Sequence, residues 1–404
     1  MPRIILHCDL NCFYASVELL SHPELKNVPV AVCGDPEARH GIILAKNEPA
    51  KKLGVKTAET IWQAKRKCPD LVLLPPHHGL YGEYSKRANA IYYEYTDLVE
   101  PFGIDESWLD VTGSLHLFGG DAKALADSIR ARIQRELGLT ISVGVSFNKV
   151  FAKLGSDYKK PDATTVISPE NWKSIVWPLP VNDLLFVGRA AGEVLGKYGV
   201  HTIGDLASCS EETMETLLGK LGTQLLRYAN GLDDSPVRPA GEREPVKSVG
   251  NSTTFRRDLT KWDELKTGIS LLSDSVAMRL RKHDLYCGGV AVGIRDANFK
   301  NISRQKLLPH STHLMREIED AALELLQGAW KAPTPVRLLS VTAIHITDKQ
   351  ETYEQLDLLG EPPESQEKQE AVESAMAKIR AKYGKDAIGY ARPQKDFGRI
   401  THHD

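Results

Sequence analysis

Three acidic side chains near the ends of short apolar segments are the residues of this sequence most suited to chemistry. Asp9 follows the apolar run at residues 4–8, and Asp105 and Glu106 stand together within residues 102–111. Mg²⁺ prefers such hard oxygen ligands and keeps waters or substrate phosphates in its remaining positions. Three carboxylates from separate segments can therefore hold two Mg²⁺ ions and support metal-ion catalysis.

The pairing of Asp105 with Glu106 also has a purely structural explanation. Composition alone gives about seven adjacent acidic pairs, because 53 of the 404 residues are acidic. In a regular strand neighbouring side chains point to opposite faces, so a shared metal site requires a bend or bulge, which Gly103 can supply. The alternative is that the two acids simply lie in a solvated turn.

The chain that must position these acids is long enough for several domains. At ~100–200 residues per domain, 404 residues predict two to four domains. Prolines and glycines mark a connector at residues 235–245 and a second break at residues 361–365. Lys and Arg number 25 against 29 Asp and Glu in residues 1–235, 17 against 12 in 236–345, and 9 against 12 in 346–404. The middle block, with a balance of +5, is therefore expected to contact phosphate.

Hydrophobic periodicity predicts how these blocks fold. Residues 4–8 are predicted as a buried strand that ends at Asp9. The 236–345 block is predicted as strand, helix, strand, strand, helix, strand, with both helices on one face of a small sheet. Its first helix carries an apolar stripe formed by Leu265, Ile269, Leu272, Val276 and Leu280. Residues 180–235 are predicted as short helices separated by glycine turns, whose backbone N–H groups can bind phosphate; an ordinary helical subdomain is the alternative.

Composition excludes several classes of protein. Hydrophobic residues make up 42% and charged residues 26% of the sequence, which excludes wholesale disorder. No apolar run reaches the ~18–20 residues of a membrane span, and the opening residues lack the apolar stretch of a secretory signal. The six cysteines show no CxxC spacing, as expected for a protein of the reducing cytoplasm. A net charge of −2 excludes a uniformly basic surface but not one basic face.

The wider sequence around the acids resembles the bacterial Y-family translesion DNA polymerases, in particular the DNA polymerase IV branch. The first match is the segment HCDLNCFYASVE at residues 7–18. Further matches follow in the family's order at residues 53–55, 104–111, 142–146, 148–153, 159–161 and 247–250. The joint order and spacing of these motifs are specific, and the resemblance covers roughly residues 1–360.

The resemblance implies an α+β multidomain fold in the form of a right hand. Its palm would have a mixed sheet, its fingers would be small, and its helical thumb would carry helix-hairpin-helix-like turns. A further α+β domain, the little finger, would bind DNA. The implied parts are the palm (1–10 and 77–167), the fingers (11–76), the thumb (168–235), a linker (236–243), the little finger (244–350) and a C-terminal tail (351–404).

The same resemblance implies a template-directed DNA polymerase. It would add dNTPs to a primer 3′-hydroxyl by two-metal-ion nucleotidyl transfer, with low fidelity, lesion bypass and no proofreading. Asp9, Asp105 and Glu106 match the family's catalytic, metal-binding carboxylates, and Leu10 matches the residue whose backbone carbonyl also faces a metal. One Mg²⁺ ion would lower the pKa of the attacking hydroxyl, and the second would neutralise the departing phosphates.

The nucleotide-binding positions carry over in the same way. Phe13 and Tyr14 match the two aromatic residues at the nucleotide site. Tyr14 takes the position of the steric gate, the ring that collides with a 2′-hydroxyl, and Phe13 is expected to be its packing neighbour; a core aromatic is the alternative for Tyr14. Lys51 and Lys160 match basic residues that hold the triphosphate. Glu48 stands where the family commonly has a tyrosine, and no role carries over to it.

Primer–template DNA, an incoming dNTP and a sliding clamp are the partners implied for this chain, as a monomer and without a membrane. The expected DNA-binding residues are Gly188 in the glycine turns, with Lys247, Arg256 and Arg257, which should flank the first strand of the little finger. The clamp-binding peptide would use Gln355, Leu356, Leu358 and Leu359. Its amide and leucines suit an apolar groove; packing of the leucines on the parent domain is the alternative.

Two other functions remain open. Another two-metal palm enzyme, such as a nucleotide cyclase, would share the carboxylates but would not need the basic block, the glycine turns or the clamp-like peptide. A non-catalytic DNA-binding or clamp-binding scaffold with a retained polymerase fold would not need three carboxylates in one place. Primer extension with Mg²⁺ and single nucleotides separates the three functions.

Overall fold

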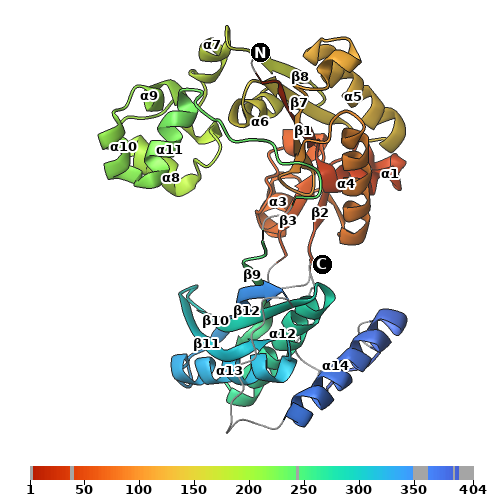
Figure 1. The fold of residues 1–404 in the computed structure, drawn as a ribbon, viewed down its shortest axis with the longest axis vertical. Helices are drawn as coiled ribbons and strands as arrows, with labels where there is room; N and C mark the ends of the chain where they lie inside the picture. Colours follow the sequence, from red (N-terminus) through yellow and green to blue (C-terminus); the bar gives the residue numbers. More distant parts are fainter. Residues whose placement is uncertain (1–2, 37–40, 243–244, 349–362, 385–386, 391–404) are drawn as a thin grey trace. The chain divides into compact units, whose positions relative to one another are not determined.

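The described part of the chain comprises residues 3–36, 41–242, 245–348, 363–384 and 387–390 of a computed structural model (Figure 1). It divides into two units. The first contains Met1–Pro36 and Gly41–Arg243, and the second contains Glu37–His40 and Glu244–Asp404. No helix among these described residues is long and apolar enough to cross a membrane.

A five-stranded mixed sheet forms the centre of the first unit. Its order is β5-β6-β1-β7-β8, with β1 antiparallel to β6 and β7, and β7 parallel to β8. The strands are β1 (Ile5–Leu10), β5 (Val99–Pro101), β6 (Glu106–Asp110), β7 (Ile141–Ser146) and β8 (Thr164–Ile167). All six residues of β1 and all six of β7 are buried, as expected for central strands covered on both faces.

Helices cover the two faces of this sheet and divide the side chains of β1 between them. Leu6, Cys8 and Leu10 belong to an apolar core shared with α4 (His78–Tyr93) and α5 (Ala122–Leu137). The alternate residues Ile5, His7 and Asp9 meet α6 (Lys149–Tyr158) on the opposite face (Figure 1). Because side chains alternate along a strand, the chemistry-bearing residues of β1 share the α6 face.

Two glycines allow α6 to lie directly on β7. A Cβ atom on Gly144 of β7 would lie 1.9 Å from the carbonyl oxygen of Ala152, and one on Gly155 of α6 would lie 2.9 Å from the Cα of Gly144. Real Cβ atoms do not approach so closely, so only glycine permits this contact. The N-cap residue Asn148 begins α6 by accepting a hydrogen bond from the Phe151 N–H.

Two smaller groups complete the first unit. A three-stranded sheet, in the order β3-β2-β4, packs with the helices α1, α2 and α3. Its elements are α1 (Phe13–Leu20), β2 (Val30–Cys33), β3 (Ile43–Lys46), α2 (Glu48–Lys52), α3 (Ile61–Lys67) and β4 (Val72–Leu74). The second group is helical and consists of α7 (Trp172–Val176), α8 (Arg189–Lys197), α9 (Ile203–Ala207), α10 (Glu211–Leu218) and α11 (Lys220–Ala229).

The second unit has the predicted order of strand, helix, strand, strand, helix, strand. Its sheet is fully antiparallel, in the order β11-β10-β12-β9. The elements are β9 (Ser248–Leu259), α12 (Trp262–Lys282), β10 (Leu285–Asp296), β11 (Asn301–Thr312), α13 (Met315–Ala329) and β12 (Val336–Asp348). Both helices pack on one face, and all five residues of the predicted stripe on α12 are fully buried.

A further helix, α14 (Pro363–Tyr383), forms ion pairs with α12. The guanidinium of Arg380 donates two hydrogen bonds to Asp274, at 3.0 and 2.9 Å. Glu373 pairs with Arg281 and accepts a hydrogen bond from the Met315 N–H at 3.0 Å. The α+β multidomain prediction is confirmed, whereas the boundaries proposed for palm, fingers and thumb stay predictions.

Candidate catalytic metal site

The strand register brings two of the predicted carboxylates face to face. Asp9 on β1 is the antiparallel partner of Glu106, the first residue of β6. Directly opposed residues of an antiparallel pair project on the same face. Asp105 lies one residue earlier, outside the strand, in the bend formed by residues 103–105, and its carbonyl oxygen accepts the Leu10 N–H at 2.9 Å. The bend that a shared site requires is therefore present.

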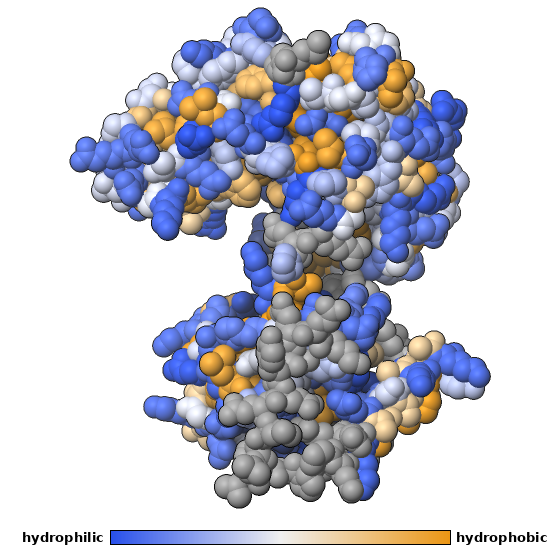
Figure 2. All heavy atoms as spheres, in the orientation of Figure 1, coloured by the Kyte–Doolittle hydropathy of each residue, from blue (hydrophilic) through white to orange (hydrophobic). Residues whose placement is uncertain are grey.

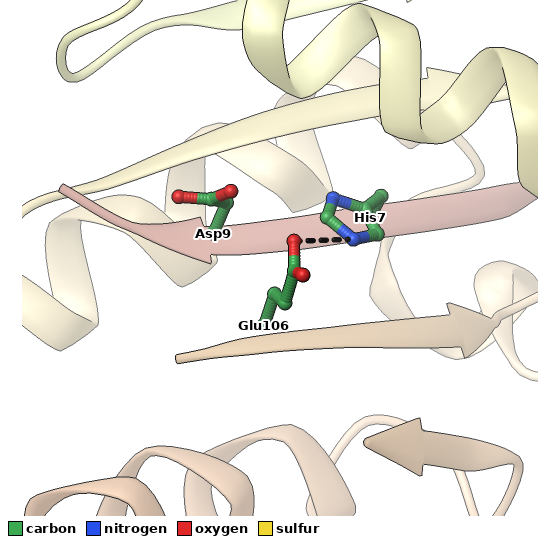
Figure 3. Close-up of side chains that lie close together, drawn as sticks. All are labelled: His7, Asp9 and Glu106. Carbon is green, nitrogen blue, oxygen red and sulfur yellow. Dashed lines mark ion pairs between the residues drawn. The ribbon is translucent and has the colours of Figure 1, made fainter. Parts of the chain in front are cut away.

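A histidine that the sequence prediction did not include joins this pair. His7, Asp9 and Glu106 offer ligand atoms that all lie within 4.8 Å of one another (Figure 3). His7 Nε2 lies 3.4 Å from Glu106 Oε2. The sequence could have predicted this position, because side chains alternate along a strand and His7, two residues before Asp9, therefore lies on the same face.

Two lysines supply positive charge at the same carboxylates. Lys153 on α6 donates to Glu106 Oε2 at 2.6 Å and to Asp9 Oδ2 at 3.2 Å. Lys160, predicted as a triphosphate contact, donates to Asp9 Oδ2 at 2.8 Å and lies 2.7 Å from Asp157 Oδ1. Sequence reasoning assigned no role to Lys153 or Asp157, although Lys153 ends one of the matched motifs.

Burial and mutual repulsion govern the protonation of these acids. Burial raises the pKa of Asp105, and the neighbouring charge of Asp9 adds to this effect. Burial also raises the pKa of Glu106, against the opposing influence of Lys153. For Lys153 and Lys160 burial acts to lower the pKa, but the carboxylates, Asp9 first, outweigh it and raise both. Each lysine therefore stays protonated, and any further cation nearby would stabilise the ionised form of the acids.

The surroundings of His7 suit a cation at this site. Ser156 Oγ lies 2.8 Å from both the Lys153 carbonyl oxygen and His7 Nδ1, so when the hydroxyl donates to the carbonyl it accepts a hydrogen bond from His7 Nδ1–H. His7 Nε2 is then a bare lone pair, and it has no hydrogen-bond partner among the described residues. Burial lowers the pKa of His7 well below its usual value, with Lys153 adding to the effect. A divalent cation could be bound by this lone pair together with Glu106 Oε2, which lies 3.4 Å from Nε2, so His7 fits the site as a further ligand.

The two aromatic residues at the start of α1 have different surroundings. The Tyr14 ring stacks on Tyr81 of α4, with centroids 4.0 Å apart and 11° between the planes. Burial raises the pKa of Tyr14, and Asp105 contributes, which places the tyrosine near the acidic site. Phe13 is only 4% exposed and belongs to the core. The burial of the Phe13 ring fits the packing role expected for it, and its place at the nucleotide site stays a prediction.

Lys51 lies on the neighbouring helix α2 and makes a weak local contact. Its Nζ is 3.4 Å from Glu48 Oε1, and both side chains are partly exposed to solvent. The same Glu48 oxygen accepts a 3.4 Å hydrogen bond from the Cys12 thiol, at the residue that precedes α1. Glu48 thus neutralises part of the Lys51 charge and links α2 to α1. The structure does not bring Lys51 to the three carboxylates.

The predicted DNA-binding arginines lie within β9, so the expectation that they flank the first strand of the second unit is wrong. The strand continues to Leu259 because Phe255 and Leu259 contribute to the core beyond a register shift. Arg256 is exposed, and Arg257 pairs with Glu264 at 2.6 Å. Lys247 is exposed immediately before the strand.

The other predicted partner sites differ in how far the structure describes them. Gly188 is the N-cap of α8, with an extended backbone. The predicted clamp peptide at residues 355–359 lies outside the described residues. On the visible face of each unit, hydrophilic and hydrophobic residues are interspersed (Figure 2).

Comparison with known proteins identifies the family. Residues 8–157 match the impB/mucB/samB family, and residues 246–358 match the C-terminal domain of the same family. A protein of Acetivibrio thermocellus named DNA polymerase IV is 48% identical over 384 residues, which cover 95% of this chain and 96% of the relative. A Bacillus subtilis protein named DNA polymerase IV 1 is 39% identical, over 96% of this chain and 92% of the relative.

A solved structure agrees with this result at the level of the fold. A Y-family DNA polymerase chimera, Dbh-Dpo4(243-245)-Dbh, superimposes with a TM-score of 0.74. The match covers 86% of this chain and 100% of the chimera at 24% identity. The sequence matches over both units and the shared fold lead to one conclusion: the chain belongs to the impB/mucB/samB family of Y-family polymerases, in the DNA polymerase IV branch.

Proposed function

We propose that this protein is a template-directed DNA polymerase that extends a primer 3′-hydroxyl, works with low fidelity and copies damaged templates. The observation that carries the proposal is the pairing of Asp9 with Glu106 across β1 and β6, with Asp105 at the adjacent bend. A fold alone does not require three carboxylates at one sheet edge, since buried acids repel one another and cost stability. Their presence argues for a metal-dependent reaction and against a non-catalytic scaffold.

Asp9, Asp105 and Glu106 would hold two Mg²⁺ ions, together with the backbone carbonyl of Leu10. When bound, the ions supply the charge that makes the primer hydroxyl a nucleophile and stabilises the departing pyrophosphate. Lys160 donates to Asp9 and Asp157 at the edge of this site, and its ammonium would bind the triphosphate when a nucleotide enters. Tyr14 would lie under the sugar of that nucleotide and exclude a 2′-hydroxyl.

The second unit would hold the DNA duplex through the open face of its sheet. Small polar residues lie in register across all four strands, as in the row Ser252, Ser340, Gly293 and Ser303. Such a surface allows close approach of a phosphate backbone and offers hydroxyl donors to it. Lys247 and Arg256 would add the charge that dominates sequence-independent affinity.

The remaining partners follow from the same function. Residues 355–359 would bind a sliding clamp and hold the enzyme at the primer end, and a monomer suffices for every step. A cytoplasmic location would suit both a DNA substrate and six free cysteines. A nucleotide cyclase is the weaker alternative, because it would use neither the open sheet of the second unit nor the basic block that contains it.

Primer extension by a Glu106→Gln variant tests the proposal. Wild type should add one matched dNTP per templating base in the presence of Mg²⁺, and Glu106→Gln should lower the rate about 10²–10³-fold or more, because a metal-binding charge is lost. Binding of primer–template DNA should change little. Glu24→Gln removes the same charge at an exposed position and is the matched control. Extension by Glu106→Gln at even a tenth of the wild-type rate would reject the two-metal assignment.

A further inference from the structure

Lys153 occupies the position between the two opposed carboxylates. Its ammonium contacts Glu106 Oε2 at 2.6 Å and Asp9 Oδ2 at 3.2 Å, so it bridges β6 and β1. Only 17% of the Lys153 side chain is exposed, which leaves these oxygens as the main replacement for its water shell. The ammonium therefore holds the acidic pair together by charge-assisted hydrogen bonds.

The same ammonium has a third partner that does not lie on the strands. Asp157 is one turn further along α6, and its Oδ2 lies 3.2 Å from Lys153 Nζ. The Asp157 side chain is 46% exposed, whereas those of Asp9 and Glu106 are 10% and 18% exposed. Asp157 can keep its contact with Lys153 whether or not the buried acids bind something else, because both residues belong to one helix.

A divalent cation and the ammonium compete for the same oxygens. Glu106 Oε2 and Asp9 Oδ2 each accept a hydrogen bond from the Lys153 ammonium, and a metal ligand must direct the same lone pairs to the metal. Two cations a few ångströms apart in a partly buried site also repel each other strongly. Lysine suits an exchange of this kind, since its ammonium is a point charge on a flexible stem.

We propose that Lys153 is an exchangeable internal counter-ion. In the metal-free protein it bridges Asp9 and Glu106, and metal binding moves its ammonium onto Asp157. Lys153 is thus a positioning residue that keeps the acids correctly spaced before the metal arrives, at the expense of metal affinity. The inference rests on the metal-binding role proposed above for Asp9 and Glu106.

Opposite effects of two substitutions on metal affinity test this exchange. The full-length protein, without DNA or nucleotide, is titrated with Mn²⁺, and free Mn²⁺ is followed by electron paramagnetic resonance. Lys153→Met removes the cation that bridges both acids, while Lys160 remains on Asp9, and should tighten Mn²⁺ binding roughly tenfold, the order of one charge-assisted contact. Asp157→Asn removes the second partner and should weaken binding several-fold, because Lys153 then stays on Asp9 and Glu106. Lys159→Met, an exposed lysine on the same segment, should leave affinity unchanged.

The outcomes distinguish the exchange from simpler roles. Unchanged or weaker Mn²⁺ binding by Lys153→Met would overturn the proposal, because the lysine would then support the loaded site. The Asp157→Asn effect should shrink by at least half in the Lys153→Met background, and an equal effect in both backgrounds would overturn the exchange, because Asp157 would then act through Lys160 or as a ligand. If Lys153→Met does not fold, undiminished affinity of Asp157→Asn alone refutes the exchange. Glu106→Gln tests the metal site separately from the exchange. Loss of Mn²⁺ binding in this variant supports the metal site even if the lysine variants contradict the exchange, whereas unchanged Mn²⁺ binding refutes the metal site.

Discussion

Replacement of Tyr14 by alanine should make the enzyme accept ribonucleotides. The Tyr14 ring is backed by Tyr81, with 4.0 Å between the ring centroids. Tyr81 is itself fully buried, pairs with Glu18 through its hydroxyl, and accepts the His77 N–H at 3.1 Å. Because the backing ring is buried and held at its hydroxyl, we expect that Tyr14 cannot retreat from a 2′-hydroxyl. Alanine leaves an open space where the collision would occur.

The size of the effect follows from the rigidity of this stack. Forcing extra atoms into a closely packed position costs ~1–3 kcal/mol. Loss of that penalty should lower discrimination against ribonucleotides about 10–100-fold, at ~1.4 kcal/mol for each factor of ten. Tyr14→Phe keeps the ring and should change discrimination by no more than about threefold. The ring stack contributes ~0.5–1.5 kcal/mol to stability, so Tyr14→Ala should remain folded.

The assay compares single-nucleotide insertion of a dNTP with that of the matching rNTP. The quantity is the ratio of their kcat/KM values for wild type, Tyr14→Ala and Tyr14→Phe, with thermal melting as a check on folding. A ratio that stays at the wild-type value in the alanine variant would show that another group excludes the 2′-hydroxyl. Phe13, the neighbouring ring at the start of α1, would be the next residue to substitute.

Two further predictions concern the partners. Neutralising Lys247 and Arg256 together should flatten the plot of log DNA affinity against log salt by ~0.9 per lost phosphate contact. Arg257→Ala should have a smaller effect, because Glu264 already pairs with Arg257. A filter-binding titration over salt checks both predictions, and an unaltered slope would mean that these side chains do not touch phosphate. Alanine at both Leu358 and Leu359 should reduce clamp-stimulated processivity to the clamp-free level. The rate of single-nucleotide insertion and the melting temperature should stay constant. A lower melting temperature with intact clamp stimulation would contradict the clamp role.

Sequence reasoning succeeded where a local pattern determines the structure. The apolar stripe from Leu265 to Leu280 predicted the buried face of α12, since a helix period of 3.6 repeats along one element. The need for a bend at Gly103 followed from strand geometry, and the chain does bend at residues 103–105. The matched motifs led us to expect Asp9 and Glu106 in one site, and the register of β1 and β6 places the two residues opposite each other.

Sequence reasoning missed what depends on packing between distant elements. Phe13 and Tyr14 are neighbours of similar character, and the position of α4 decides that the first ring is in the core and the second is only partly buried. The helix α14 carries no strong apolar stripe that would have predicted its packing. Ion pairs such as Arg380 with Asp274 connect it to α12. Charge patterns of this kind do not identify a partner in the sequence, since most charged residues on a helix face solvent.

The helix α6 explains why the roles of His7 and Lys153 were hidden. Its approach to β7 depends on Gly144 and Gly155, and neither residue has a side chain with chemistry of its own. That close approach brings Ser156 within 2.8 Å of His7 Nδ1 and lets Lys153 reach both strands that carry the acids. The glycines thus control the electrostatics of the metal site through a distance between backbones. A motif match marks such positions as characteristic of a family, but only the packed structure gives the physical reason.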